Sequence, residues 1–326
     1  MKTVLITHTP SALDNYFGPR AMAALGSVAV VRRNPTEAPF DTAGLIAAAR
    51  DCDIVIADRR TEGPADVFRS LPRLVAFARC AVDIRNIDVA AASREGILVT
   101  QASAGFMASV AEWTIGMMID LSRSLSSANA AFHAGLEPPL RMGSELRGST
   151  IGIIGYGRIG RYLGGLASAF GMRVLVSDPH AAADASRVAQ VPLLQLLSES
   201  DHVVCLANAS EATENLMDAA AFASMKPTAF FINASRGNLV DEPALLEALD
   251  SARIAGCALD VGRAPDQMPS PALARHPKII ATPHIGGLTL PAIEHQALET
   301  VDQVAAILAG RIPAGAVNAG SARRLG

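Results

Sequence analysis

One stretch decides the fold: Ile151-Gly152-Ile153-Ile154-Gly155-Tyr156-Gly157-Arg158-Ile159-Gly160. The apolar run predicts a buried strand, and the Gly-x-Gly-x-x-Gly motif then opens a helix. In such a motif the first glycine permits a tight turn, the second lets the backbone approach a pyrophosphate, and the third lets helix and strand pack closely. The sequence therefore predicts a doubly wound Rossmann domain that holds a dinucleotide at Gly155, Gly157, Arg158, Ile159 and Gly160.

An acidic residue indicates which dinucleotide binds. Asp178 ends the next predicted strand, about 20 residues after the motif, where a carboxylate accepts hydrogen bonds from the adenosine ribose and repels a 2′-phosphate. Pro179 and His180 follow it, with no arginine. The other interpretation of Asp178 is a plain strand-end turn before Pro179, which the glycine motif disfavours. We therefore expect NAD rather than NADP.

The bulk composition fits a soluble α/β protein. Half of the 326 residues are hydrophobic, 4% are aromatic and the net charge is -3. No basic stripe is available for a phosphate backbone, so we expect no nucleic-acid partner. Glu112 interrupts the longest apolar run, and residues 1–7 lead into a strand without the apolar region of a signal peptide. We expect a cytoplasmic protein without a membrane partner.

The cysteines are widely scattered: Cys52, Cys80, Cys205 and Cys257. Three of them lie in apolar runs, where a free cysteine behaves as a small hydrophobic residue. Their spacing matches no metal site. We expect reduced core residues and no bound metal.

Two series of short, continuously apolar runs predict two parallel sheets, because such runs are typical of strands covered on both faces. The first series comprises residues 4–7, 28–32, 53–58, 74–79 and 97–100. The second comprises residues 150–155, 173–178, 202–207, 229–234, 254–260 and 279–282. Helical patterns alternate with these strands, as crossovers between parallel strands require.

Two further helices set the domain organisation. A helix over residues 106–130 joins the two series, and a helix over residues 290–308 has no sheet partner left, so we expect it to pack on the first domain. The tail from Gly310 is expected to be loosely ordered. The predicted fold is α/β: a doubly wound Rossmann NAD-binding domain, residues 101–287, inserted into a flavodoxin-like substrate domain, residues 1–100 and 288–326.

Two polar side chains follow strands of the second series, at the sheet edge where ligands bind. Arg236 comes after strand 229–234, and its planar guanidinium can hold a carboxylate and polarise a neighbouring carbonyl. His284 comes after strand 279–282 and can transfer a proton while a nicotinamide transfers a hydride. The plainer interpretations are an exposed salt-bridging arginine and a structural histidine.

The chain resembles the D-isomer-specific 2-hydroxyacid dehydrogenases, which include the D-3-phosphoglycerate dehydrogenases. The resemblance rests on motifs spread over nearly the whole sequence: Asn86-Ile87-Asp88, Val110-Ala111-Glu112, Leu146-Arg147-Gly148, residues 233–241, Ala258-Leu259-Asp260-Val261 and residues 282–287. It implies an NAD-dependent oxidoreductase acting on a small D-2-hydroxy acid or the matching 2-oxo acid, with 3-phosphoglycerate as one candidate. It also implies a homodimer built on the cofactor domain.

The resemblance assigns roles to individual residues. It implies that Arg236 binds and polarises the substrate, that His284 is the acid/base, and that Asp260 lies near the nicotinamide amide. It further implies that the loop with Arg79, Ala81 and Val82 touches the substrate carboxylate. The other cofactor contacts that it implies are Ala207, Asn208, Ala234, Ser235, His284, Gly286 and Gly287.

One departure from the family concerns the partner of His284. The family pairs its histidine with a glutamate at the position that Pro265 occupies here. Asp266 or Gln267 could take its place if the loop follows another path; otherwise His284 lacks the carboxylate that orients it. The alternative hypothesis is therefore a catalytically weak or silent NAD-binding protein of a sensor or corepressor type. Arg236 and His284 together favour the enzyme.

Overall fold

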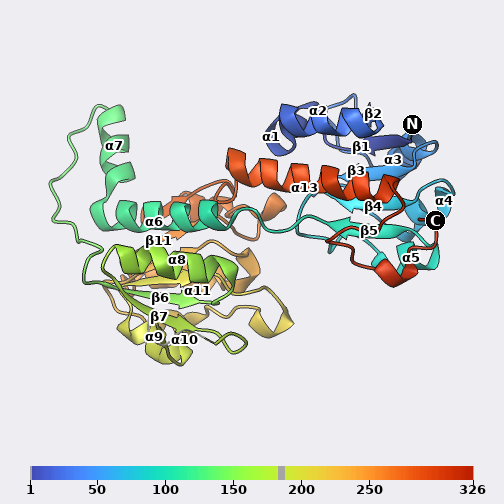
Figure 1. Ribbon diagram of the computed structural model, residues 1–326. Helices are drawn as coiled ribbons and strands as arrows, with labels where there is room; N and C mark the ends of the chain where they lie inside the picture. Colours follow the sequence, from blue (N-terminus) through green and yellow to red (C-terminus); the bar gives the residue numbers. More distant parts are fainter. Residues whose placement is uncertain (1, 183–187, 326) are drawn as a thin grey trace. The chain divides into compact units, whose positions relative to one another are not determined.

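The computed structural model describes residues 2–182 and 188–325, apart from the side chain of Asp266. The chain divides into two compact units. Unit 1 comprises Met1–Phe106 and Leu290–Gly326, and unit 2 comprises Met107–Thr289. Each unit is built on a parallel sheet of its own, with helices packed against it (Figure 1). The predicted α/β class is therefore confirmed.

The sheet of unit 1 has five strands in the order β2-β1-β3-β4-β5, all parallel. They are β1 (Thr3–Ile6), β2 (Val30–Arg33), β3 (Ile54–Ala57), β4 (Ala76–Arg79) and β5 (Leu98–Gln101). Successive side chains of a strand point to opposite faces. Val4 and Ile6 accordingly lie in one core cluster and Leu5 in the other. Both faces are buried along β1, β3, β4 and β5, which explains their continuous apolar runs, whereas the edge strand β2 is mostly exposed.

Helices from both ends of the chain cover this sheet: α1 (Pro10–Tyr16), α2 (Gly18–Val28), α3 (Thr42–Ala49), α4 (Ala65–Ser70), α5 (Val89–Arg94) and α13 (Leu290–Leu308). Asp41 caps α3 by accepting the N–H of Gly44. The last helix, α13, packs against α2 and β4 and places Ala297, Val301 and Val304 in the core of unit 1. The expectation that it returns to the first domain is confirmed.

The segment after β5 belongs to unit 1 as far as Phe106. Ser103 donates its backbone N–H (2.7 Å) and its hydroxyl (2.8 Å) to Glu299 Oε2 on α13. These bonds hold the segment after β5 in unit 1, so the boundary between the units lies after residue 106 rather than after the predicted residue 100. At its other end unit 2 continues to Thr289, whereas the sequence analysis ended it at residue 287.

The tail after α13 is ordered, so the expectation of loose order is wrong. Val317 donates its N–H to the carbonyl of Val99 (2.8 Å), and Asn318 Oδ1 accepts the N–H of Val99 (2.8 Å). Arg324 Nη1 donates to the carbonyl of Leu71 (2.8 Å). Backbone pairing with β5 holds the tail in place, and composition does not reveal such pairing.

The sheet of unit 2 has seven parallel strands in the order β12-β11-β10-β9-β6-β7-β8. They are β6 (Thr150–Ile154), β7 (Arg173–Ser177), β8 (Ala189–Gln190), β9 (His202–Cys205), β10 (Phe230–Asn233), β11 (Gly256–Leu259) and β12 (Ile279–Ala281). The helices of the unit are α6 (Met107–Arg123), α7 (Leu125–His133), α8 (Arg158–Ala169), α9 (Leu193–Glu199), α10 (Ala219–Ala223), α11 (Glu242–Asp250) and α12 (Pro271–Ala274). The strand order reverses between β6 and β9, which makes this a doubly wound sheet.

The predicted helix over residues 106–130 is in fact two helices, α6 and α7. Ser124 between them has φ +55, in the left-handed region. Asp120 fixes the break, because its carboxylate accepts the N–H of Ser126 (2.8 Å) and its carbonyl accepts the N–H of Ser124 (2.6 Å). No glycine or proline marks the turn, so the apolar periodicity predicted one continuous helix.

All four cysteines are free and buried. Burial raises the pKa of every one of these thiols, to about 12 for Cys80 and Cys205. Their interpretation as reduced core residues is confirmed. None of the helices in the described ranges is long and apolar enough to cross a membrane.

Candidate active site

The glycine motif forms the turn between β6 and α8. Gly155 has φ +93, and a Cβ on it would lie 2.6 Å from the backbone nitrogen of Ala207. A Cβ on Gly160 would lie 2.4 Å from the carbonyl oxygen of Gly155, so only glycine allows the helix to approach this closely. A Cβ on Gly157, in contrast, would meet nothing within 4 Å. That open position is where a phosphate group can reach the backbone.

The N-terminus of α8 is open to an anion. Gly157 is its N-cap, and no described side chain caps the N–H groups of the first turn, formed by Arg158, Ile159 and Gly160. The first turn also contains no acidic residue. Uncapped N–H groups and the helix dipole make such an end an anion-binding site. The residues present therefore fit the phosphates of a dinucleotide.

Asp178 follows β7 and ties the glycine turn to the next loop. Its Oδ2 accepts the N–H of Tyr156 (2.7 Å), and its Oδ1 accepts those of His180 (2.7 Å) and Ala181 (3.1 Å). Burial alone would raise the pKa of Asp178, but these hydrogen bonds outweigh it and hold the pKa below its ordinary value. The half-buried carboxylate is thus ionised at neutral pH, as recognition of a ribose hydroxyl requires. The bonds to His180 and Ala181 are those of a strand-end turn, the other interpretation of Asp178, and the bond to Tyr156 in the glycine turn was not predicted.

Arg236 lies in the turn after β10, half-buried and on extended backbone. Its Nη1 donates to the carbonyl of Ser235 (2.7 Å). Ser235 donates its hydroxyl to the carbonyl of Ala207 (2.6 Å) in the loop after β9. A Cβ on Gly237 would lie 2.1 Å from the carbonyl carbon of Gly262, so the turn packs directly on the loop after β11. The loops after β9, β10 and β11 therefore meet around Arg236.

His284 follows β12 in a strained backbone conformation. Its φ is +56, and that region costs a non-glycine residue on the order of 1–3 kcal/mol. Asp260, directly after β11, holds the flanking backbone: Oδ1 accepts the N–H of Ile285 (2.8 Å) and the Thr282 hydroxyl (2.6 Å), and Oδ2 accepts the N–H of Gly286 (2.7 Å). Asp260 is 3% exposed. Its carboxylate is committed to the turn that presents His284, a role that the sequence analysis missed.

The single tryptophan of the chain lies beside this turn. The ring of Trp113, on α6, is 3.6 Å from where a Cβ on Gly286 would be. Its Nε1 is buried and has no hydrogen-bond partner within the described ranges. A buried donor without a partner is rare in folded proteins, and a bound molecule is one explanation for it. This donor fits the amide end of a dinucleotide, the end at which the resemblance places Asp260.

The remaining predicted cofactor contacts lie on the same edge of the unit 2 sheet. They follow three parallel strands, whose carboxyl ends share one edge: Ala207 and Asn208 after β9, Ala234 and Ser235 after β10, and Gly286 and Gly287 after β12. In open α/β sheets this edge is where ligands bind.

The loop after β11 carries Pro265 in place of a glutamate. Pro265–Gln267 form a short 3-10 helix, and Gln267 has φ +59. The Oε1 atom of Gln267 is buried with no hydrogen-bond partner among the residues that the structure describes. The side chain of Asp266, the other candidate partner of His284, lies outside the described residues. Gln267 thus leaves an amide oxygen as an acceptor in this loop.

Arg79 ends β4 in unit 1, and its guanidinium is turned inward. The residue is 0% exposed and donates to the carbonyls of Asp58 and Thr61 (2.8 Å for Thr61) and to Asn86 Oδ1 (2.7 Å). Burial lowers its pKa to about 10, so it remains charged at neutral pH. These bonds join the loops after β3 and β4. The guanidinium has no exposed surface for the substrate contact that the resemblance implies.

Ala81 and Val82 are half-buried in the loop after β4. The carbonyl of Ala81 accepts the N–H of Ala102 (3.1 Å). Neither Ala81 nor Val82 donates its backbone N–H to another residue in the described part of the chain. Two consecutive N–H groups without an internal partner can bind a carboxylate.

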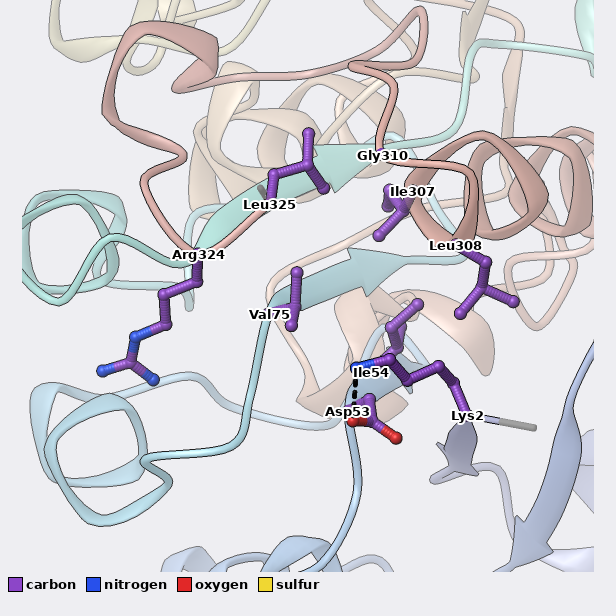
Figure 2. A pocket seen from close by; sticks show the side chains of 9 residues that line it. All are labelled: Lys2, Asp53, Ile54, Val75, Ile307, Leu308, Gly310, Arg324 and Leu325. Carbon is purple, nitrogen blue, oxygen red and sulfur yellow. Dashed lines mark hydrogen bonds and ion pairs between the residues drawn. The ribbon is translucent and has the colours of Figure 1, made fainter.

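A separate cavity of about 210 Å³ lies in unit 1, at the amino ends of β1 and β3 (Figure 2). Lys2 and Asp53 form an ion pair at its edge (3.3 Å), and its apolar wall includes Val75, Ile307 and Leu325. Ligands of such sheets bind at the carboxyl ends, in pockets of roughly 300–1,000 Å³. This cavity is therefore not a candidate active site.

The doubly wound sheet with its phosphate turn defines a Rossmann dinucleotide-binding unit. Residues 115–286, more than half of the chain, match the family model of the D-isomer specific 2-hydroxyacid dehydrogenase, NAD binding domain. The chain therefore belongs to the D-isomer specific 2-hydroxyacid dehydrogenases, and its cofactor is NAD.

Individual relatives agree with this assignment. D-3-phosphoglycerate dehydrogenase of Sus scrofa is 36% identical over 280 residues, which cover 84% of this chain and 52% of the relative. The chain thus spans about half the length of the curated relatives it matches. Among solved structures, the TT0316 protein of Thermus thermophilus has a TM-score of 0.86 at 28% identity, covering 97% of this chain and 99% of its own. The apo D-lactate dehydrogenase of Escherichia coli has a TM-score of 0.83 at 25% identity, covering 97% and 100%.

Proposed function

We propose that the protein is an NAD-dependent oxidoreductase that acts on the CH–OH group of a small D-2-hydroxy acid or reduces the matching 2-oxo acid. One observation carries the proposal: the phosphate turn, Arg236 and His284 all follow strands at one edge of the unit 2 sheet. Bound NAD supplies the hydride exchange. 3-Phosphoglycerate is one candidate substrate, supported by the phosphoglycerate dehydrogenases among the relatives.

Arg236 binds and polarises the substrate in this proposal. A planar guanidinium holds a carboxylate and the adjacent carbonyl oxygen together, which a lysine cannot do. Positive charge at that oxygen stabilises the negative charge that develops on it during reduction. The close packing at Gly237 and Gly262 supports this role, because it holds the backbone that bears the guanidinium.

His284 transfers the proton. In the reductive direction it donates a proton to the carbonyl oxygen as the carbonyl carbon accepts the hydride; in the oxidative direction it removes the hydroxyl proton. Asp260 keeps the strained turn in place through Ile285 and Gly286. Asp260 therefore positions the acid/base in addition to the role near the nicotinamide amide that the resemblance implies.

Unit 1 recognises a carboxylate in this proposal. The N–H groups of Ala81 and Val82 would bind it, and Arg79 would act indirectly by fixing the loop that carries them. Among the described residues these N–H groups have no hydrogen-bond acceptor, which supports the first role. The bonds of Arg79 to Thr61 and Asn86 support the second role.

We further propose a cytoplasmic homodimer. Exposed apolar side chains gather on α7 and the segment after it, at Leu125, Phe132, Leu136, Leu140 and Met142. Apolar patches of this kind mark interaction surfaces, and free buried cysteines suit a reducing compartment. Light scattering on wild type and Leu140→Glu tests the assembly: we expect a dimer that the charge weakens, and a monomeric wild type would contradict it.

The activity is tested by following NADH absorbance with a panel of 2-oxo acids that includes phosphorylated ones. We expect at least one to be reduced by wild type, and Arg236→Lys to lower kcat/KM roughly a hundredfold or more. Energy transfer from Trp113 to bound NADH reports cofactor binding in the same samples, and we expect it to be unchanged.

The outcomes distinguish the two hypotheses that the sequence leaves open, a dehydrogenase and an NAD-binding protein of a sensor or corepressor type. Turnover that depends on Arg236 supports the enzyme. NADH binding without turnover of any 2-oxo acid, or of 2-hydroxy acids with NAD, would overturn the proposal in favour of an NAD-binding sensor.

A further inference from the structure

One buried amide lies directly behind Arg236. Asn233, the last residue of β10, is 0% exposed. Its Nδ2 donates to the carbonyl of Arg236 (2.9 Å), and its Oδ1 accepts the N–H of Ser235 (3.1 Å). A single side chain thus bonds the backbone on both sides of the arginine Cα.

The chemistry of these two bonds requires a carboxamide. One end of the side chain must donate and the other must accept, and asparagine offers both groups within the reach of this turn. An aspartate would place a carboxylate oxygen against the carbonyl of Arg236, and leucine would leave both backbone groups unpaired. Either change leaves buried polar groups without partners, which is costly.

The remaining backbone around Asn233 is held as well. Its carbonyl accepts the N–H of Asp260 (3.1 Å), and Ser235 donates its hydroxyl to the carbonyl of Ala207 (2.6 Å). Gly237 abuts Gly262 so closely that a Cβ has no room. Because the neighbours are fixed, the amide of Asn233 sets the backbone at Arg236 itself.

We infer that Asn233 is a positioning residue for Arg236: its amide fixes the backbone from which the guanidinium reaches the substrate. The inference rests on the proposed function, because it needs Arg236 to act on a substrate. Catalytic groups must be held to within a fraction of an ångström, so a small shift of this backbone lowers the rate. Asn233 itself is 0% exposed, so its effect on a substrate must pass through Arg236.

A double-mutant cycle tests the inference with Asn233→Asp, which keeps the size of the side chain, and Arg236→Lys. On the wild-type background we expect Asn233→Asp to lower kcat/KM about tenfold to a hundredfold. On the Arg236→Lys background the same change should cost less than about threefold, because no correctly placed guanidinium is left to misplace. Binding of NADH, followed through Trp113, should stay within about twofold in all four proteins.

Matched variants complete the design. Asn238→Asp changes a half-buried amide of the same segment, whose hydrogen bond to Glu214 (2.9 Å) lies at the surface, and should leave kcat/KM unchanged. If Asn233→Asp yields no folded protein, Asn233→Ser, which retains a donor and an acceptor, replaces it in the cycle.

The outcomes distinguish the two levels of the argument. Equal factors for Asn233→Asp on both backgrounds would show a general structural role and overturn the inference, as would unchanged kcat/KM on the wild-type background. If Arg236→Lys alone leaves turnover unchanged, the proposed function itself fails.

Discussion

Arg79 and Arg236 occupy similar places in the two sheets and do different things. Both stand at the carboxyl end of a parallel strand, β4 in unit 1 and β10 in unit 2. Arg79 is 0% exposed and donates to three oxygens of its own unit. Arg236 is half-buried, and buried groups around it hold its backbone. The comparison shows that the place of an arginine in the fold does not determine its role. The role depends on whether the N–H groups of its guanidinium point into the protein or toward the surface.

The surroundings of the two arginines differ in the same sense. Near Arg79, Asp58 accepts the N–H (2.8 Å) and hydroxyl (2.8 Å) of Thr61, and burial lowers the pKa of neighbouring His8 to about 4. The polar groups of this cluster bond to one another. In unit 2 the buried Asn233 and Asp260 bond the backbone of turns that carry half-buried side chains. Buried polar groups bond to one another and to nearby loops in unit 1, and they bond the backbone of the turns that carry Arg236 and His284 in unit 2.

The largest expected effect is on stability, where substitution of Arg79 should cost far more than substitution of Arg236. Arg79→Met leaves the carbonyls of Asp58 and Thr61 and the amide oxygen of Asn86 without their donor, so we expect a loss of about 3–5 kcal/mol in the free energy of unfolding. Arg236→Met should change it by less than about 1 kcal/mol. Urea unfolding measures both, and hydrogen exchange in β3 and β4 locates the loss in unit 1. Equal destabilisation by the two variants would break the comparison.

A smaller effect is expected at the anchor of His284. Asp260→Asn keeps one acceptor but turns an N–H donor toward the N–H of Gly286, so the strained turn loses part of its support. We expect kcat to fall about tenfold to a hundredfold, with a loss of stability of about 1–3 kcal/mol. Steady-state rates and urea unfolding check this. A stability loss with unchanged kcat would show that Asp260 supports the fold without positioning His284.

Unit 2 has a buried histidine as well, and it should make stability depend on pH. Burial lowers the pKa of His202 to about 4 from its ordinary 6.5. Below pH 6.5 His202 is protonated in the unfolded chain but stays neutral in the folded protein. The free energy of unfolding is therefore at its full value above pH 6.5 and falls as the pH drops toward 4. The loss should be on the order of 2–3 kcal/mol near pH 4.5.

His202→Asn removes the titrating imidazole and so isolates its contribution to the pH dependence of stability. The variant should lose less stability than wild type between pH 7 and pH 4.5, measured by urea unfolding at each pH. His133→Asn, at an exposed position, serves as the control and should leave the dependence unchanged. Parallel pH curves for wild type and His202→Asn would contradict the account.

The sequence predicts the buried strands of the two sheets well and misses β8, whose two residues are exposed. Strands buried on both faces have unbroken apolar sequences, and Gly155, Gly157 and Gly160 identify the phosphate turn because they directly follow such a run. The inward direction of Arg79 could not be predicted, because its acceptors, Asp58 and Thr61, come from a loop about twenty residues away and only the fold brings them together.

The anchors of the candidate site were missed for a related reason. Asn233 and Asp260 act through hydrogen bonds to backbone, and no residue pattern encodes which backbone groups a turn will present. The break at Ser124 likewise depends on hydrogen bonds to Asp120 rather than on a glycine or proline. Roles that depend on side-chain direction need the structure.

The central claim is that unit 2 carries out proton and hydride transfer with His284 as the acid/base. The most direct measurement titrates NADH into wild type and His284→Ala, follows energy transfer from Trp113, and then adds a reducible 2-oxo acid. The account predicts that both proteins bind NADH, while His284→Ala, saturated with NADH, turns over at least about a hundredfold more slowly. Undiminished turnover by His284→Ala would contradict it.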